Sequence, residues 1–222
     1  MRNPPAILLG AGGHAKVILD LLRNAGFEIL GVCDPQLASE QTDEWLGLPV
    51  LGDDDAVDRY TPDAVLLANG LGSLPGNSLR RRINDKFTQK GYCFATLIHS
   101  SAIIGSGVKL GIGTQIMAGV IVQAATRLGD DTVLNTGARV DHDGEVGDHV
   151  HIAPGAVLSG NVTVGDSCHI GPGATLIQGV EMGAGAIIGA GTVVLSDVPS
   201  GHKLLGCAPN LPSAMTSMGE HE

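Results

Sequence analysis

The residues best suited to proton transfer are four histidines that lie between positions 142 and 169. Imidazole titrates near neutral pH, so a histidine can serve as a general base. His142 stands between Asp141 and Asp143, and a carboxylate bonded to one ring nitrogen would leave the other nitrogen able to accept a proton. The pattern indicates His142 and Asp143 as candidate catalytic residues, and solvated polar side chains are the alternative interpretation.

These histidines lie in a segment where an aliphatic residue recurs at every sixth position. The repeat runs through seventeen consecutive hexads, from Ile98 to Val194, and every member is Ile, Leu, Val or Met. Six residues accommodate a short strand and a turn, and three such units close one triangular coil, so residues 18 apart would be separated by about 4.8 Å. The pattern predicts a parallel β-helix, since a β-sandwich would need period-two alternation and uneven loops.

The 18-residue coil gives His142 two small neighbours. Ala124 lies one coil before His142 and Gly160 lies one coil after it. Two small residues beside an outward-facing imidazole would leave a hollow in which a thin substrate could lie.

The same coil places His151 and His169 on adjacent coils of one face. Two stacked histidines could share a zinc ion if their nitrogens converge on it at about 2.0–2.1 Å. A metal site is therefore one open interpretation of this pair. His149 falls in the middle of its hexad and is expected to point to solvent.

The first 97 residues carry a different pattern, in which apolar runs of strand length alternate with helices. Strands are predicted at 6–10, 28–33, 64–68 and 92–97. Amphipathic helices are predicted before Ala25-Gly26 and from about Ser78 to Gln89. Alternating strands and helices are typical of a small parallel α/β sheet.

The turn after the first predicted strand is rich in glycine. The segment Gly10-Ala-Gly-Gly-His-Ala15, followed by Asp34, fits the dinucleotide fingerprint, whose glycines let backbone N–H groups approach a phosphate. Asn69-Gly70 follows another strand, and ligands of parallel sheets bind at such strand ends. Fewer than 100 residues supply only one of the two halves of an NAD site, so a nucleotide-linked metabolite is favoured over NAD. A tight turn without a ligand is the remaining alternative.

Composition excludes several classes of protein. Thirteen basic and 23 acidic residues give a net charge of −10, which argues against nucleic acid as a partner. No apolar run approaches the roughly 20 residues of a membrane span, and no signal peptide is recognisable, so a cytoplasmic location is expected. A hydrophobic fraction of 43% argues against disorder. The four cysteines form no CxxC pair and are expected to be buried.

Several motifs together resemble those of the NeuD/PglD-type family of hexapeptide-repeat sugar acyltransferases, over residues 6 to about 209. They are Gly10-Ala-Gly-Gly-His14, Ile98-His-Ser-Ser-Ala102, Leu134-Asn-Thr136, His142-Asp143 and His151-Ile-Ala-Pro-Gly155. The resemblance implies a Rossmann-like α/β half domain (1–97) that binds a nucleotide sugar, a left-handed parallel β-helix (98–199) and a C-terminal tail (200–222). It also implies homotrimers with active sites in the clefts between subunits.

The resemblance implies direct transfer of an acetyl group from acetyl-CoA, without a resident metal, in bacterial glycan biosynthesis. The acceptor would be the amine of a UDP- or GDP-linked amino sugar, such as a 4-amino-4,6-dideoxy sugar. His142 resembles the general base, and Asp143 stands where an acidic residue raises its basicity. The positions that resemble the acetyl-CoA site are His151, Gly160, Pro172 and Ala190. Those that resemble the nucleotide-sugar site are Gly12, Gly13, His14, Asp34, Pro35 and Gly70.

Three other functions stay open: O-acetylation of a sialic acid-type sugar, a zinc lyase of the β-helical carbonic anhydrase kind, and a scaffold without catalytic activity. The chain also departs from the family at Gly206-Cys-Ala-Pro-Asn210, where relatives carry Gly-x-Pro-Ala followed by a basic residue. Beyond residue 97 the basic residues are Lys109, Arg127, Arg139 and Lys203. The sequence therefore leaves open which groups neutralise the phosphates of CoA.

Overall fold

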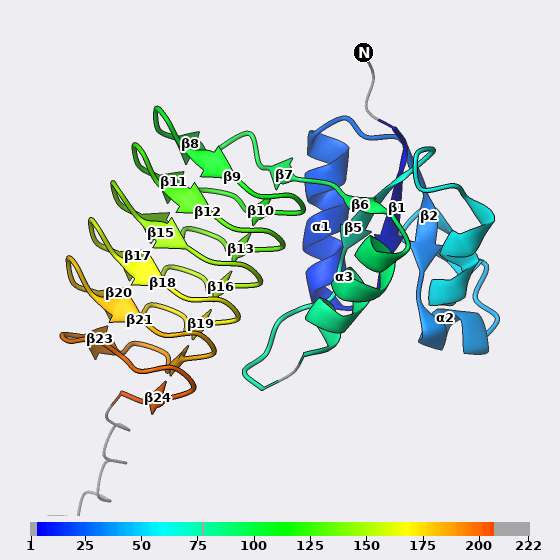
Figure 1. Ribbon diagram of the computed structural model, residues 1–222. Helices are drawn as coiled ribbons and strands as arrows, with labels where there is room; N and C mark the ends of the chain where they lie inside the picture. The colour runs from blue at the N-terminus through cyan, green and yellow to red at the C-terminus, as the bar shows by residue number, and fades with distance from the viewer. Residues whose placement is uncertain (1–3, 77, 207–222) are drawn as a thin grey trace, which may run out of the picture.

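The computed structural model describes residues 4–76 and 78–206. An α/β domain lies beside a long prism of stacked triangular coils, and helix α1 (Gly13–Asn24) lies between the two (Figure 1). This arrangement confirms the predicted combination of an α/β domain and a parallel β-helix. No helix among the described residues is long and apolar enough to cross a membrane.

The α/β domain contains a sheet of strand order β3-β4-β2-β1-β5-β6. Its strands are β1 (Ala6–Leu9), β2 (Ile29–Cys33), β3 (Glu44–Trp45), β4 (Leu48–Gly52), β5 (Leu66–Asn69) and β6 (Cys93–Phe94). Its other helices are α2 (Pro35–Ser39), the 3₁₀ helix η1 (Asp54–Arg59) and α3 (Leu79–Gln89). The four strands predicted in this region are present. The antiparallel hairpin of β3 and β4 was not predicted, because Gly47 and Pro49 interrupt the short apolar stretch from which it forms.

Helix α1 joins the two parts of the molecule. It buries Ile18, Leu19 and Leu22, and contacts β1 and β5 on the side of the α/β domain. It also contacts β7, the first strand of the prism. The chain leaves α1 at Gly26, whose φ of +72° is a left-handed conformation that glycine adopts without strain.

The prism has three parallel faces built from strands of two residues each. The face covered by the α/β domain, called the docking face, contains β7 (Leu97–Ile98), β10 (Gln115–Ile116), β13 (Val133–Leu134), β16 (His151–Ile152), β19 (His169–Ile170), β22 (Ile187–Ile188) and β24 (Lys203–Leu204). The second, called the apolar face, contains β8 (Ile103–Ile104), β11 (Ile121–Val122), β14 (Arg139–Val140), β17 (Val157–Leu158), β20 (Thr175–Leu176) and β23 (Val193–Val194). The third, called the polar face, contains β9 (Lys109–Leu110), β12 (Arg127–Leu128), β15 (Glu145–Val146), β18 (Thr163–Val164) and β21 (Glu181–Met182).

The hexad prediction is confirmed residue by residue. Each aliphatic residue of the repeat is the second residue of a strand, from Ile98 in β7 to Val194 in β23. Most of these side chains fill the interior, and the preceding residue of each strand faces outward. From β7 to β23, strands paired within a face are 18 residues apart, as His151 and His169 are, whereas β22 and β24 pair at a spacing of 16 residues. The docking face continues to β24, past residue 199, and residues 207–222 of the predicted tail lie outside the described residues.

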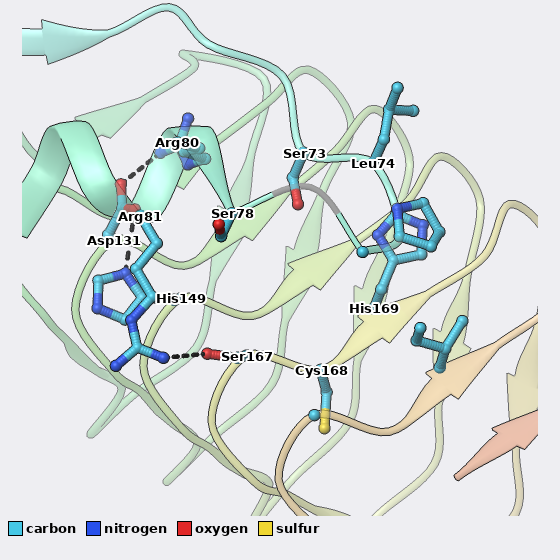
Figure 2. A pocket seen from close by; sticks show the side chains of 14 residues that line it. Ser73, Leu74, Ser78, Arg80, Arg81, Asp131, His149, Ser167, Cys168 and His169 are labelled. Atoms are coloured by element: carbon cyan, nitrogen blue, oxygen red, sulfur yellow. Dashed lines mark hydrogen bonds and ion pairs between the residues drawn. The ribbon is translucent and has the colours of Figure 1, made fainter. Parts of the chain in front are cut away.

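A buried ion pair fastens the α/β domain to the prism. Arg80 of α3 contacts Asp131 (Figure 2) with an N–O distance of 2.5 Å. Another nitrogen of the Arg80 guanidinium donates to the carbonyl oxygens of Asn69 and Leu71. His149 lies 3.2 Å from Asp131 with a side chain only 15% exposed. The solvent-facing position expected for His149 is therefore wrong, because the α/β domain covers this corner of the prism.

The cysteines differ in burial. Cys33 and Cys168 are buried, as expected, whereas Cys93 is exposed and contradicts the expectation. Cys93 belongs to β6, which is the edge strand of its sheet and has no neighbour on one side. Cys207 lies outside the described residues.

Candidate functional site

A cavity of about 480 Å³ lies at the carboxyl ends of β1, β2 and β5. This is the edge where ligands of parallel α/β sheets bind. The predicted nucleotide-sugar residues that line the cavity are Gly12, Gly13, His14, Asp34 and Gly70. Pro35 is exposed in the first turn of α2 and does not line it. The cavity is called the nucleotide cavity below.

Glycines shape the nucleotide cavity in two ways. A β-carbon at Gly12 or Gly13 would meet no atom within 4 Å, so the backbone here is open to the cavity. No side chain caps the N-terminus of α1, which begins at Gly13, and helix N-termini favour anions. The backbone at Gly70 is closely packed instead, because a β-carbon there would lie 2.7 Å from the carbonyl oxygen of Leu9.

The carboxylate of Asp34 closes the rim of the nucleotide cavity. One oxygen accepts a hydrogen bond of 2.9 Å from the backbone of Ala11 in the glycine-rich turn. The other accepts hydrogen bonds of 2.9 and 3.0 Å from the backbone of Gln36 and Leu37 in α2. Asp34 therefore ties α2 to the glycine-rich turn, and its remaining acceptor capacity is available to a ligand.

His14 stands at the inner end of the nucleotide cavity with a defined tautomer. Its Nε2 lies 3.0 Å from Oε1 of Gln115, whose Nε2 donates a hydrogen bond of 2.8 Å to the carbonyl oxygen of Asn69. Burial, aided by the charge of Arg80, lowers the pKa of His14 to about 4. The neutral ring therefore donates from Nε2 to Gln115, which leaves Nδ1 as a hydrogen-bond acceptor.

A second cavity of about 650 Å³, called the cleft, lies along the docking face. Outward residues of successive strands line it: His151, His169, Ile187 and Lys203. Residues Gly72–Pro75, a loop of the α/β domain, line it as well. His14 and Gly72 line both the cleft and the nucleotide cavity, so the two cavities adjoin at these residues.

The residues predicted for acetyl-CoA are divided by the structure. His151, Pro172 and Ala190 line the cleft. Gly160 does not, because it follows β17 of the apolar face. A smaller side chamber of about 270 Å³ adjoins the cleft beyond His169 and reaches Arg80, Arg81 and Ser167 (Figure 2).

The stacking predicted for His151 and His169 is confirmed. Their ring centroids are 5.0 Å apart and their planes differ by 6°. His151 is 6% exposed, and burial, with smaller contributions from His169, His14 and Arg80, lowers its pKa to about 3. Burial also lowers the pKa of His169, so both rings are neutral near pH 7. Each ring has a buried Nδ1 without a hydrogen-bond partner among the described residues, which leaves polar atoms for a ligand to satisfy.

The stacked geometry bears on the zinc interpretation. Parallel rings direct their nitrogen lone pairs along parallel planes, whereas zinc requires ligands that converge tetrahedrally. Within residues 4–76 and 78–206, no three His, Cys, Asp or Glu side chains form a group that could hold a metal ion. The geometry of this pair therefore lends no support to a zinc site.

His142 is bonded to Asp143 in the manner that general-base chemistry needs. Its Nδ1 lies 2.8 Å from Oδ2 of Asp143, and this hydrogen bond is the main reason why the pKa of His142 is raised. Asp143 has a φ of +57°, and this left-handed turn brings the short carboxylate back toward the ring. The side chain of His142 is 54% exposed.

Gly160 lies directly beneath the ring of His142. A β-carbon at position 160 would lie 2.6 Å from both Cε1 and Nε2 of the imidazole. The hollow predicted beside His142 is therefore occupied on this side by the imidazole itself.

Within one chain, the candidate base and the cleft lie at different corners of the prism. His142 and Gly160 lie in turns that follow strands of the apolar face, whereas His151 lies on the docking face. His142 does not line the cleft. A single chain therefore carries two separated parts of the predicted site.

One residue and one loop that lie in or near these cavities were not singled out from the sequence. Gln115 lies on the docking face two coils before His151, so the coil period was a signal that could have found it. The loop Gly72–Pro75 comes from the α/β domain, and no periodicity relates that domain to the prism.

A glycine-rich α/β domain docked on a prism of hexads, with a cleft along the prism, defines the class of hexapeptide-repeat transferases. Family models for the PglD N-terminal domain and for the bacterial transferase hexapeptide (six repeats) match residues 6–87 and 161–196. The chain belongs to the PglD/NeuD family of sugar acyltransferases.

Solved structures of similar proteins cover almost the whole chain. The acetyltransferase domain of PglB from Neisseria gonorrhoeae is 33% identical, with a TM-score of 0.83 over 92% of this chain and 97% of that one. PerB from Caulobacter crescentus, in complex with CoA and GDP-perosamine, is 36% identical, with a TM-score of 0.81 over 91% of this chain and 94% of that one. These matches confirm the Rossmann-like half domain and the left-handed parallel β-helix.

A curated relative is similar over a shorter stretch. The UDP-N-acetylbacillosamine N-acetyltransferase of Bacillus subtilis is 34% identical over 113 residues. The aligned part of the chain spans 50% of this chain and 50% of that relative.

Proposed function

We propose that this chain is an acetyl-CoA-dependent N-acetyltransferase that acts on a nucleotide-linked amino sugar. The observation that carries the proposal is the position of His14, which lines both the nucleotide cavity and the cleft. An acceptor bound in the nucleotide cavity can extend past His14 toward a donor in the cleft. Two similar structures support the assignment, since one contains acetyl coenzyme A and another contains CoA with GDP-perosamine.

In this proposal the nucleotide binds at the glycine-rich turn. The uncapped N-terminus of α1 at Gly12 and Gly13 receives the diphosphate, and Asp34 holds the turn in place. The sugar then extends toward His14, whose Nδ1 accepts a hydrogen bond from it. The donor occupies the cleft, with the thioester near His151 and the rest of CoA along Pro172 and Ala190.

The catalytic base would come from a neighbouring subunit of a homotrimer. The apolar face exposes large aliphatic side chains, among them Ile103 at 60% and Val193 at 58%. Exposed apolar surfaces of this kind favour association. Packing this face on a second prism would bring the corner that carries His142 and Gly160 to the cleft of the neighbour. The two parts of the site, separated in one chain, would then meet.

The reaction needs no acyl-enzyme intermediate. The amine nitrogen attacks the thioester carbon and forms the C–N bond, while Nε2 of His142 accepts the proton of the amine. Asp143 stabilises the imidazolium through Nδ1, and a backbone N–H stabilises the oxyanion. When the intermediate collapses, the C–S bond breaks, and the proton on His142 passes to the CoA thiolate.

A purified-protein assay tests the proposal. Acetyl-CoA should release free thiol when a UDP- or GDP-linked 4-amino sugar is present, and the His142→Ala variant should be slower by at least roughly 100-fold. Turnover of hydroxyl sugars alone would identify an O-acetyltransferase instead. Stoichiometric zinc would identify a lyase, and no acetyl-CoA binding by calorimetry would identify a scaffold. The cytoplasmic location stays a prediction.

A further inference from the structure

The outward side chains of the docking face change in character along the prism. The strands that line the cleft present, in order, His151, His169, Ile187 and Lys203. Successive strands of this series are paired, so the four residues form one continuous ladder. The ladder runs from polar neutral rings near His14, through an aliphatic residue, to a cation at the far end.

Lys203 is the one charged residue among those that line the cleft, within the part of the chain that the structure describes. No aspartate or glutamate lines the cleft there. The side chain of Lys203 is exposed, and no hydrogen bond or ion pair joins it to the residues of 4–76 and 78–206. Its ammonium group is therefore not neutralised by that part of the chain.

The other basic residues of the repeat segment lie on other faces of the prism. Arg127 forms an ion pair of 3.2 Å with Glu145 on the polar face, where Lys109 also lies. Arg139 belongs to the apolar face. The chain as a whole has a net charge of −10, which repels a polyanion unless a local cation offsets it.

We propose that Lys203 binds the phosphate groups of CoA and so orients the donor in the cleft. This inference rests on the proposed function, because it takes CoA as the occupant of the cleft. Three rungs separate Lys203 from His151, roughly 14 Å at the spacing of parallel strands. Phosphates at Lys203 leave the thioester at the end of the cleft where His14 gives access to the nucleotide cavity.

The reverse orientation would place phosphates against His151 and His169. Burial keeps both rings neutral near pH 7, so neither would offer the phosphates a positive charge. It would also place the thioester beside the exposed Leu205, remote from His14. The ladder therefore favours a single orientation.

The test uses variants at two lysines in matched positions and measures each variant with two donors. Lys203→Met removes the charge and keeps most of the length of the side chain. Lys109→Met is the control, because Lys109 is also exposed and also precedes a leucine as the first residue of a prism strand, but on the polar face. The donors are acetyl-CoA and S-acetylpantetheine, which carries the thioester without the phosphates.

The Lys203→Met variant should raise the KM for acetyl-CoA about tenfold, with kcat nearly unchanged, since one charge-assisted contact is lost. Its kinetics with S-acetylpantetheine should match those of the unmodified chain. Lys203→Arg should retain most of the affinity for acetyl-CoA, and Lys109→Met should leave the kinetics with both donors unchanged. An unchanged KM for acetyl-CoA, or an equal loss with both donors, would overturn the proposal.

Calorimetry with CoA separates this proposal from the proposed function. If the unmodified chain transfers no acetyl group to any sugar but binds CoA, a roughly tenfold weaker affinity in Lys203→Met still supports the role of Lys203. Equal affinity in the two proteins removes that role. If the unmodified chain transfers acetyl groups but Lys203→Met binds CoA with unaltered affinity, the proposed function is supported. In that case the contact between Lys203 and the phosphates is rejected. If the unmodified chain does not bind CoA, both fail.

Discussion

The imidazole of His142 rests on Gly160, so closely that a β-carbon at position 160 would approach the ring to 2.6 Å. Gly160 has no left-handed backbone conformation, so alanine would fit its backbone and would clash only with the histidine. One methyl group can therefore displace the candidate base without altering the coil.

We expect Gly160→Ala to lower kcat by about 10- to 100-fold, because displacing a reacting group by about 1 Å has effects of this size. Steady-state thiol release measures the change. Thermal unfolding serves as the control, because the melting temperature should stay close to that of the unmodified chain. Full activity in Gly160→Ala would show that the position of the ring does not limit the reaction.

The hydrogen bond between His142 and Asp143 predicts a shift in the pH profile. Asp143 raises the pKa of His142, so Asp143→Asn should lower it. Because the base acts in its neutral form, the acidic limb of the kcat/KM profile should then move to lower pH. The rate on the plateau should fall about tenfold, since a less basic imidazole is a weaker proton acceptor.

Asp141→Asn is the matched control for this measurement. Asp141 also lies beside His142, but it accepts the backbone N–H of that residue and acts on the ring through its charge alone. A smaller shift is expected in this variant. Equal shifts in the two variants would show that the hydrogen bond at Nδ1 has no special role.

The buried His151 should make stability depend on pH. In the folded chain its pKa is lowered to about 3, whereas in the unfolded chain it returns to the ordinary histidine value of 6.5. Below pH 6.5 the unfolded state binds a proton that the folded state does not, so stability decreases as the pH falls from 6.5 toward 3. At pH 5 this one group would cost about 2 kcal/mol relative to pH 7.

His151→Gln should therefore unfold with a weaker pH dependence between pH 7 and pH 5, measured by denaturant titration at each pH. His202→Gln is the comparison, because it makes the same substitution at an exposed histidine directly before β24. A pH dependence that survives in His151→Gln would assign it to other groups.

The ion pair between Arg80 and Asp131 should be the most sensitive point of the domain contact. Both side chains are buried, so removing one partner leaves an uncompensated buried charge, at a cost of about 3–5 kcal/mol. Arg80→Met should lower the melting temperature strongly, and adding Asp131→Asn should restore part of the loss. Asparagine suits position 131, where φ is +49°.

Arg81→Met provides the contrast for the same measurement. Arg81 is the next residue of α3, is exposed, and bonds to Ser167 across the same contact. Exposed pairs contribute about 0–1 kcal/mol, so this variant should unfold almost as the unmodified chain does. Similar losses for Arg80→Met and Arg81→Met would mean that burial of the ion pair is unimportant.

Separation of His142 from the cleft within one chain predicts complementation between inactive variants. His142→Ala removes the base, and Pro172→Trp fills the cleft with a large ring. If each site takes its base from one subunit and its cleft from another, chains that carry the two changes should form about a quarter of intact sites when co-assembled at random.

Co-expression and thiol release test this prediction, with each variant alone as the inactive control. Light scattering on Val193→Asp, which places a charge on the apolar face, should show smaller particles than the unmodified chain. No recovery of activity on mixing would indicate that each chain builds its site alone.

The sequence predicts the prism in detail and the domain contact hardly at all. The hexad period fixes which residues enter the strands, so the stacking of His151 on His169 follows from an 18-residue spacing alone. Asp131 lies one 18-residue coil before His149, but no period relates His149 to Asp85 of α3, which helps to cover it. Gln115 likewise gains its role only when the α/β domain brings His14 against it. Local repetition is readable in the sequence, whereas the docking of unlike domains depends on side chains far apart along the chain.

The stacked coils also fix the distances between outward side chains on one face of the prism. Because the prism lengthens only by whole coils, the distance between two outward side chains of one face changes only in steps of about 4.8 Å. Adding or removing 18 residues would keep the triangular cross-section and the inward aliphatic residues, and would move Lys203 by one such step relative to His151. The length of a ligand that the docking face can hold between Lys203 and His151 can therefore change only by whole coils.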